Sequence, residues 1–259
     1  MGAVAPGGIP EGASPPNPAL VRPFVTGLHR SRGILHETRL GTMAARDDIL
    51  ARIRAALGRD GPLTDAEAAA VRAKLREHPR GPLPRMDWDR VTRFRERCIS
   101  LSSTVDAVAD LAHAPGAISR FLAASNLGPS GACWPQFAGL DWSGAGLSIE
   151  ARPARAEDQL GITGAYCAIA ETGTLMLLSG GDTHATTSLL PDTHVALVPV
   201  SRIVPAMEDG WDLLRREHGS LPRQVSFISG PSRTADIEMT LVLGAHGPCR
   251  VHIVLVTGE

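Results

Sequence analysis

The sequence predicts an α/β protein in which helices cover both faces of a layered, largely parallel sheet. Short apolar runs with many β-branched residues alternate with helical segments along the second half of the chain. These runs are apolar at successive positions, which is typical of strands buried on both faces. At 259 residues the chain is long enough for one such domain with additional segments.

The first 42 residues differ in composition from the rest of the chain. The stretch "MGAVAPGGIPEGASPPNPAL" is rich in glycine and proline and has no apolar period, so burial cannot offset its ordering entropy. We expect residues 1–42 to be a disordered or non-native extension, Met43 to be the natural start, and residues 43–259 to form a single domain. A transit peptide is the alternative, although the prolines disfavour an amphipathic helix.

Four helices are expected before residue 130. The first begins at Met43, where Ile49, Ile53 and Leu57 form one apolar stripe. The second is "TDAEAAAVRAKLREH", whose first residue and the glutamate three places later have the spacing of a capping box. Two more helices are expected at "STVDAVADLAHA" and "GAISRFLAASNLG".

After residue 160 the pattern changes to that of strands separated by helices. Strands are expected at "AYCAIAETGTLMLL", "THVALVPV", "QVSFIS" and "RVHIVLVT". Helices are expected between them at "IVPAMEDGWDLLRREHG" and "SRTADIEMTLVLG". This alternation is the reason for expecting a parallel sheet with helices on both sides.

Charge and composition disfavour several kinds of partner. The chain has 26 basic and 27 acidic residues and only 4% aromatic residues, so nucleic acid and anionic membrane surfaces are not expected as main partners. No apolar run approaches the roughly 20 residues of a membrane span, and no secretory signal is evident. A cytoplasmic location is therefore expected.

The cysteines and histidines do not have the spacing of a metal site. The four cysteines (Cys98, Cys133, Cys167 and Cys249) form no CxxC pair, so buried structural thiols are expected, with no metal and no iron–sulfur cluster in this chain. Dinucleotide, Walker A and GxSxG motifs are also absent, and no cofactor is expected within the chain.

The loop "GPSR" between an expected strand and an expected helix is the first candidate site. Ser232 or Thr234 would cap the helix, whose free N–H groups attract anions, and Arg233 would add a guanidinium fork. Gly230 and Asp236 complete this predicted anion-binding set. The alternative is an ordinary capped helix with a solvated arginine.

Glu171 is the second candidate, because it is a lone acid within a long apolar run. Thr172, Gly173 and Thr174 follow it, so a turn is expected there, with these three residues in contact with substrate. The carboxylate would act as a base, a nucleophile or a substrate clamp. The alternative is a turn glutamate that accepts hydrogen bonds from the backbone.

His246 in the loop "GAHGP" is the third candidate. Glycines near it allow the backbone to approach a ligand closely, and a histidine carries a proton near neutral pH. The alternative is an exposed loop histidine without a role in chemistry.

The motifs "AIAETGT", "SLLPDTHVALV", "ISGPSRTADIE" and "GAHGP" follow one another in this order. Over residues 43–259 the chain resembles the lactate utilization domain family, and within it the C-type subfamily. The resemblance implies a fold like that of the glucosamine-phosphate isomerase, ribose-phosphate isomerase and CoA transferase group. It also implies a subunit of a system that oxidises L-lactate to pyruvate, with A- and B-type partner proteins that carry the iron–sulfur clusters.

By this resemblance Glu171 would be the carboxylate of a transferase-like site, and the "GPSR" loop would hold a small anionic substrate across a pocket. One departure concerns the stretch before "SLLP". The family often has an arginine there, whereas this chain has His184 and Thr186. A second departure is Cys249 where an arginine is common, with Arg250 one place later.

Two further functions remain open from the residues. One is a stand-alone transferase, isomerase or cyclo-ligase that acts on a phosphorylated or CoA-linked small molecule. The other is a non-catalytic assembly module whose pocket senses a metabolite.

Overall fold

The computed structural model describes residues 34–59, 61–234 and 242–258, and only the backbone of residues 34–44 and 242. The chain divides into two compact units, residues 1–78 and 79–259. Residues 1–33 of the expected extension lie outside the described residues. The natural start at Met43 and the single domain over 43–259 stay predictions.

The described residues of the first unit form helices α1 (Ile34–Ala56) and α2 (Asp65–Glu77). Helix α1 was expected to begin at Met43 and begins earlier. Helix α2 begins at the predicted capping box: the Glu67 carboxylate accepts from the Thr64 N–H at 2.8 Å, and Thr64 Oγ1 accepts from the Glu67 N–H at 3.3 Å. The local sequence therefore specifies where α2 begins, independently of tertiary packing.

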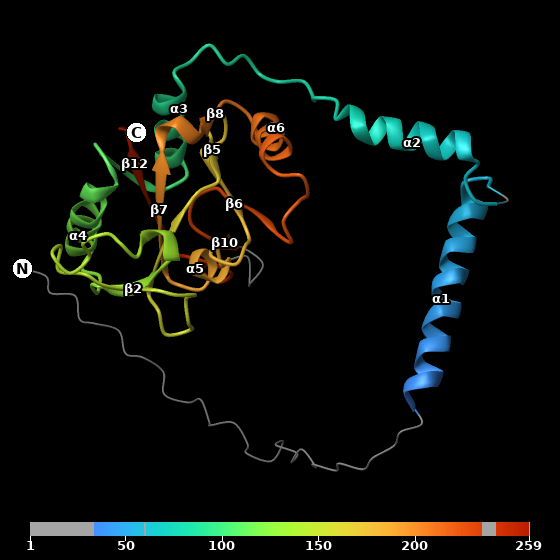
Figure 1. Cartoon of the computed structure of the whole chain (residues 1–259), viewed down its shortest axis with the longest axis horizontal. Helices are drawn as coiled ribbons and strands as arrows, with labels where there is room; N and C mark the ends of the chain where they lie inside the picture. The colour runs from blue at the N-terminus through green and yellow to red at the C-terminus, as the bar shows by residue number, and fades with distance from the viewer. Residues whose placement is uncertain (1–33, 60, 235–241, 259) are drawn as a thin grey trace, which may run out of the picture. The chain divides into compact units, whose positions relative to one another are not determined.

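The second unit is built on a parallel sheet of six strands (Figure 1). The sheet order is β1-β12-β7-β4-β2-β3, and every neighbouring pair runs parallel. The strands are β1 (Thr104–Val108), β2 (Ser130–Cys133), β3 (Ser148–Ala151), β4 (Leu160–Gly164), β7 (Thr193–Pro199) and β12 (Arg250–Val256). The predicted parallel α/β architecture is confirmed.

Helices cover both faces of this sheet, as the continuous apolar strands predicted. On one face Phe121 of α4 (Ala114–Ala124) stacks on His252 of β12, with ring centroids 3.9 Å apart. His194 of β7 is paired with Val251, the residue before His252, so the two histidines point to opposite faces. The short helix α5 (Thr186–Leu189) packs against β4 and β7.

A second sheet of four strands has the order β8-β5-β6-β9. Its strands are β5 (Cys167–Ile169), β6 (Thr174–Leu178), β8 (Ile203–Val204) and β9 (Val225–Ile228). The stretch "AYCAIAETGTLMLL", expected as one run, is the antiparallel hairpin β5–β6 of this sheet. Strand β9 also pairs antiparallel, with β6, so parallel pairing holds for the first sheet and for β5–β8 only.

The second sheet lies between the main core and a helix. Leu175 and Leu177 point into the main core, whereas Cys167 and Met176 pack against Leu214 of α6 (Met207–Glu217). Helix α3 (Arg90–Ser100) contributes Phe94 and Cys98 to the main core. Short 3-10 helices at Leu111–His113, Pro135–Phe137 and Val200–Arg202 complete the connections.

One predicted helix is wrong, and a second is wrong at its described ends. The stretch "STVDAVADLAHA" forms β1 and a 3-10 turn, because Thr104–Val108 pairs along its whole length with β12. Of the helix expected over residues 232–244, residues 235–241 lie outside the described residues, and the described ends are strands: Arg233–Thr234 is β10, paired antiparallel with β11 (Val242–Leu243). At β1, pairing with a strand far away in the chain overrides the local helical pattern.

Three of the four cysteines are buried, as expected, and all four are free thiols. Burial raises the pKa of Cys98 to about 12 and that of Cys133 and Cys167 to about 11. These thiols therefore stay protonated near neutral pH and fill the core as small apolar groups. Among the described helices, none has both the length and the apolar composition needed to cross a membrane.

The two buried histidines make stability depend on pH. The Thr163 hydroxyl contacts one ring nitrogen of His194 at 2.7 Å. The Thr104 hydroxyl contacts one ring nitrogen of His252 at 2.8 Å. The other ring nitrogen of each has no hydrogen-bond partner in the described part of the chain. Burial lowers both pKa values to about 4, from an ordinary value of about 6.5.

We predict that the free energy of unfolding falls as the pH drops from about 6.5 to about 4, because the unfolded chain binds protons that the folded chain excludes. The expected loss is about 2 kcal/mol for each histidine at about pH 5. Urea unfolding of wild type, His252→Gln and the exposed control His246→Gln at about pH 7.5 and 5 measures it. An undiminished pH dependence in His252→Gln would contradict the prediction.

Candidate functional site

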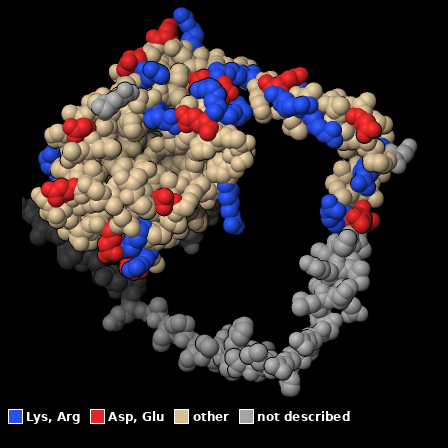
Figure 2. Space-filling view, in the orientation of Figure 1, with Lys and Arg blue, Asp and Glu red and all other residues tan. Residues whose placement is uncertain are grey.

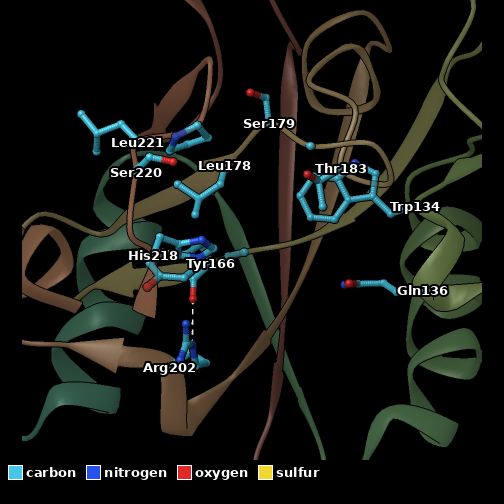
Figure 3. A pocket seen from close by; sticks show the side chains of 13 residues that line it. Trp134, Gln136, Tyr166, Leu178, Ser179, Thr183, Arg202, His218, Ser220 and Leu221 are labelled. Carbon is cyan, nitrogen blue, oxygen red and sulfur yellow. Dashed lines mark hydrogen bonds between the residues drawn. The ribbon is translucent and has the colours of Figure 1, made fainter. Parts of the chain in front are cut away.

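The second unit contains a hollow of about 550 Å³ beside the carboxyl ends of three parallel strands. Trp134 and Gln136 follow directly after β2, Ala165 and Tyr166 follow β4, and Arg202 ends the 3-10 turn after β7. The hollow is also lined by Leu178, Ser179, Gly180, Thr183, His218, Ser220, Leu221 and Pro222 (Figure 3).

The connectivity of the sheet explains why a hollow forms at this position. Strands β2 and β4 are neighbours, but β2 continues outward to β3, whereas β4 continues to β7 on its other side. The segments that leave two adjacent strands in opposite directions separate and leave a crevice between them. Such a switch point is where open parallel sheets usually bind ligands.

Two aromatic side chains form opposite walls of the hollow (Figure 3). The Trp134 indole donates from Nε1 to the carbonyl oxygen of His184 at 3.1 Å, which fixes its ring plane. The Tyr166 hydroxyl donates to Glu217 Oε2 at 2.7 Å. The His218 ring meets the Tyr166 ring edge-on, with centroids 5.6 Å apart. The walls are therefore held in place before any ligand arrives.

The charge of Arg202 is balanced inside the wall. Its two Nη atoms donate to the Glu217 carboxylate at 2.8 and 2.9 Å, and its Nε donates to the Tyr166 carbonyl at 2.8 Å. The hydrogen bonds from Arg202 and Tyr166 lower the pKa of Glu217 to about 2. Burial, followed by the hydrogen bond to Glu217, raises the pKa of Tyr166 to about 12. The pair stays ionised and the phenol stays protonated near neutral pH.

The residues predicted around Glu171 form a polar turn in the second sheet. Glu171 is half-buried, and its N–H donates to Pro205 O at 2.9 Å. The hydroxyls of Thr172, Thr174 and Ser229 form a chain with two contacts of 2.7 Å. The predicted turn is confirmed, and Ser229 is a member of the cluster that the sequence did not single out.

The end of helix α3 holds this turn and the "GPSR" loop together. Gly173 has a φ of +69°, and a Cβ there would lie 2.7 Å from Arg97 Cβ. Gly230 has a φ of +79°, and a Cβ there would lie 2.6 Å from Leu101 O. Both glycines are therefore required by backbone conformation and by close approach. The Nε of Arg97 is buried and lacks a hydrogen-bond partner among the described residues.

Ser232, Arg233 and Thr234 were expected to hold an anion at a helix N-terminus, and the helix expected after them falls on residues 235–241, outside the described residues. Arg233 and Thr234 lie in β10, and the Ser232 N–H donates to Pro248 O at 2.8 Å. The Arg233 Nη2 donates to Ser102 Oγ and to Leu101 O, at the C-terminus of α3. Arg233 therefore binds the carbonyl end of a helix, where a cation is stabilising.

His246 is exposed in the loop before β12, and Asp236 lies outside the described residues. None of the described residues that the sequence singled out lines the hollow. Their roles in chemistry stay predictions. The structure also forms no group of three or more His, Cys, Asp and Glu side chains that would hold a metal ion, within the residues it describes.

The hollow depends on residues that sequence reasoning missed. Tyr166 is the single tyrosine of the chain and Trp134 is one of four tryptophans. Trp134 directly follows β2 and Tyr166 lies two residues after the end of β4, which is the position where ligand contacts are expected in this architecture. The strands before them, β2 and β4, were not predicted, so that positional signal was not available.

Comparison of this sequence with known proteins shows its family. The LUD domain family profile matches residues 138–256. The chain is 32% identical to "Lactate utilization protein C" of Exiguobacterium sp., over 83% of this chain and 97% of that protein. This chain belongs to the LUD domain family.

Other relatives match over shorter regions. The "Lactate utilization protein C" of Anoxybacillus flavithermus is 44% identical over 38% of this chain and 44% of its own length. That of Bacillus subtilis is 38% identical over 48% and 53%. The chain thus spans about half the length of these curated relatives. A "DUF162 family protein" structure from Deinococcus radiodurans has a TM-score of 0.47 at 25% identity, covering 68% of this chain and 99% of that chain.

The LUD domain match spans both the polar turn at Glu171 and most of the hollow's lining, while Trp134 and Gln136 precede it. Residues outside the matched region therefore contribute to the candidate site of this chain.

We predict that Gly173→Ala lowers the free energy of unfolding by about 2–3 kcal/mol, because it combines a positive φ with a clash against α3. Gly181→Ala is the matched control, since a Cβ at that position meets nothing within 4 Å. Urea unfolding of both variants measures the difference. Equal stability of the two variants would contradict the close packing of the turn on α3.

We predict that Arg233→Ala lowers the free energy of unfolding by about 1 kcal/mol through lost hydrogen bonds to the α3 C-terminus. Arg223→Ala, at another exposed arginine in the loop before β9, serves as the control. A melting temperature unchanged in Arg233→Ala but accompanied by lost ligand binding would support the anion-binding role predicted from the sequence instead.

Proposed function

We propose that this chain acts in lactate utilization, as the C-type subunit of a system that oxidises L-lactate to pyruvate. The observation that carries the proposal is the similarity to a protein named "Lactate utilization protein C" along 97% of that protein. The same name recurs among the shorter matches at 38–44% identity.

The proposed reaction requires an electron acceptor. Oxidation of the lactate carbinol to a ketone releases two protons and two electrons, so an electron acceptor must take part. We propose that A- and B-type partner proteins supply it through their iron–sulfur clusters, which are one-electron carriers. The resulting assembly is an oxidoreductase complex of which this chain is one subunit.

The polar turn at Glu171 is the proposed contact for the anionic substrate. Thr172, Thr174 and Ser229 provide hydroxyl groups that donate or accept hydrogen bonds. Arg97 packs against the same turn and has a buried donor without a partner in the described structure. A carboxylate would satisfy such a donor. Glu171 and His246 remain the proposed proton carriers of the site.

We also propose the cytoplasm as the location of this chain. Three cysteine side chains are buried as free thiols within the core. A reducing compartment keeps such thiols from oxidising.

Complementation tests the proposed function. We expect this chain to restore growth on L-lactate in a Bacillus subtilis strain that lacks its own lactate utilization protein C, while growth on glucose stays unchanged. Gly181→Ala should complement as well as the wild type, because that glycine is exposed and unconstrained. Glu171→Gln should fail to complement if the turn carries the chemistry.

The same strain provides the decisive control. Soluble expression and co-purification with the host's A- and B-type proteins are measured alongside growth. A chain that folds and binds these partners but restores neither growth on lactate nor lactate-dependent dye reduction would contradict the proposed function.

A further inference from the structure

We infer that the hollow at the switch point between β2 and β4 binds an uncharged, flat ring compound, aromatic or heteroaromatic, which is distinct from the small anion proposed at the Glu171 turn. This inference does not rest on the proposed function.

The size of the hollow is the first argument. Its volume of about 550 Å³ lies within the range of roughly 300–1,000 Å³ typical of sites for drug-sized ligands and cofactors. A three-carbon acid such as lactate would fill only a small part of this volume. Its position at the carboxyl ends of adjacent parallel strands is that of a ligand site rather than of a packing defect.

The shape of the lining is the second argument. Trp134 and Gln136 lie on one side of the hollow, and Tyr166, Leu178 and His218 lie on the other (Figure 3). Aromatic rings offer flat apolar faces on which a planar ligand stacks. Hydrogen bonds fix both aromatic residues, through His184 O for Trp134 and through Glu217 for Tyr166. The slot between the walls is therefore preformed, which reduces the entropic cost of binding.

The charge of the lining is the third argument. Arg202 is the permanent cation among the described lining residues, and its three guanidinium nitrogens donate to Glu217 or to the Tyr166 carbonyl. Its charge also lies over the Tyr166 ring, 4.8 Å from the centroid. The Glu217 carboxylate thus already balances the Arg202 charge, so an anion in the hollow would gain no uncompensated positive charge. More widely, acidic and basic side chains are interspersed on the face drawn in Figure 2.

The polar groups of the hollow suit the edge of a heterocycle. Gln136 provides an amide with both donors and an acceptor, and Thr183 and Ser220 provide hydroxyl groups. The Ser179 hydroxyl accepts from the Gln224 N–H at 2.9 Å and so is held in a fixed position. Few polar groups around apolar faces are typical of sites that recognise a flat organic ring.

Direct binding to the isolated full-length chain tests the inference. The probes are lumichrome, menadione and adenine, which are flat and uncharged, with L-lactate and pyruvate as small-anion comparators. We expect at least one flat probe to bind in calorimetry, with its affinity lowered about tenfold or more in Ala165→Phe and in Ser220→Trp. Both substitutions add bulk to the lining, and Ser220 is exposed, so the second variant should fold even if the first does not.

Ala124→Trp is the matched control, because Ala124 is exposed at the end of α4 and does not line the hollow. Its affinity for the probes should equal that of the wild type. Absence of binding by all three flat probes at about 1 mM would overturn the inference. Binding that is unchanged in the blocking variants, or that L-lactate or pyruvate displaces competitively, would also overturn it. Because the isolated chain is used, these outcomes are independent of growth on lactate.

Discussion

Parallel pairing of β4, β7 and β12 is the interaction on which the rest of the second unit depends. These strands are buried on both faces, so helices must cover both sides, and their carboxyl ends must meet at one edge of the sheet. The chain continues from β2 toward β3 and from β4 toward β7, on opposite sides, and this separates the loops at that edge. The hollow with Trp134 and Tyr166 follows from this topology rather than from a local motif.

Helix α3 has a second organising role. Its C-terminal turn receives Gly173 and Gly230 by close backbone approach and Arg233 by hydrogen bonding. The motifs "AETGT" and "GPSR", which are about 60 residues apart in the sequence, are thus joined through a third segment. This arrangement explains why both motifs contain a glycine at a positive φ.

The two candidate regions differ in chemistry. The turn at Glu171 is small, rich in hydroxyl groups and adjacent to Arg97, which suits a small anion. The hollow is large, has aromatic walls and carries a neutralised ion pair, which suits a flat uncharged ring. A chain that binds a small anion at the turn and a larger ring compound in the hollow would have two separate ligand sites in one domain.

The sequence by itself determined the features that depend on neighbouring residues. The capping box of α2, helices α4 and α6, strands β7, β9 and β12 and the Glu171 turn all have strong local patterns, and all were predicted. The motifs also identified the family. Only the tertiary structure decided that Thr104–Val108 is a strand, that β5 and β6 form a hairpin in a second sheet, and that Arg233 binds the end of α3. The strand at Thr104–Val108, the place of the hairpin in a second sheet and the contact of Arg233 each depend on a partner far away in the chain, and local propensity contains no information about such a partner.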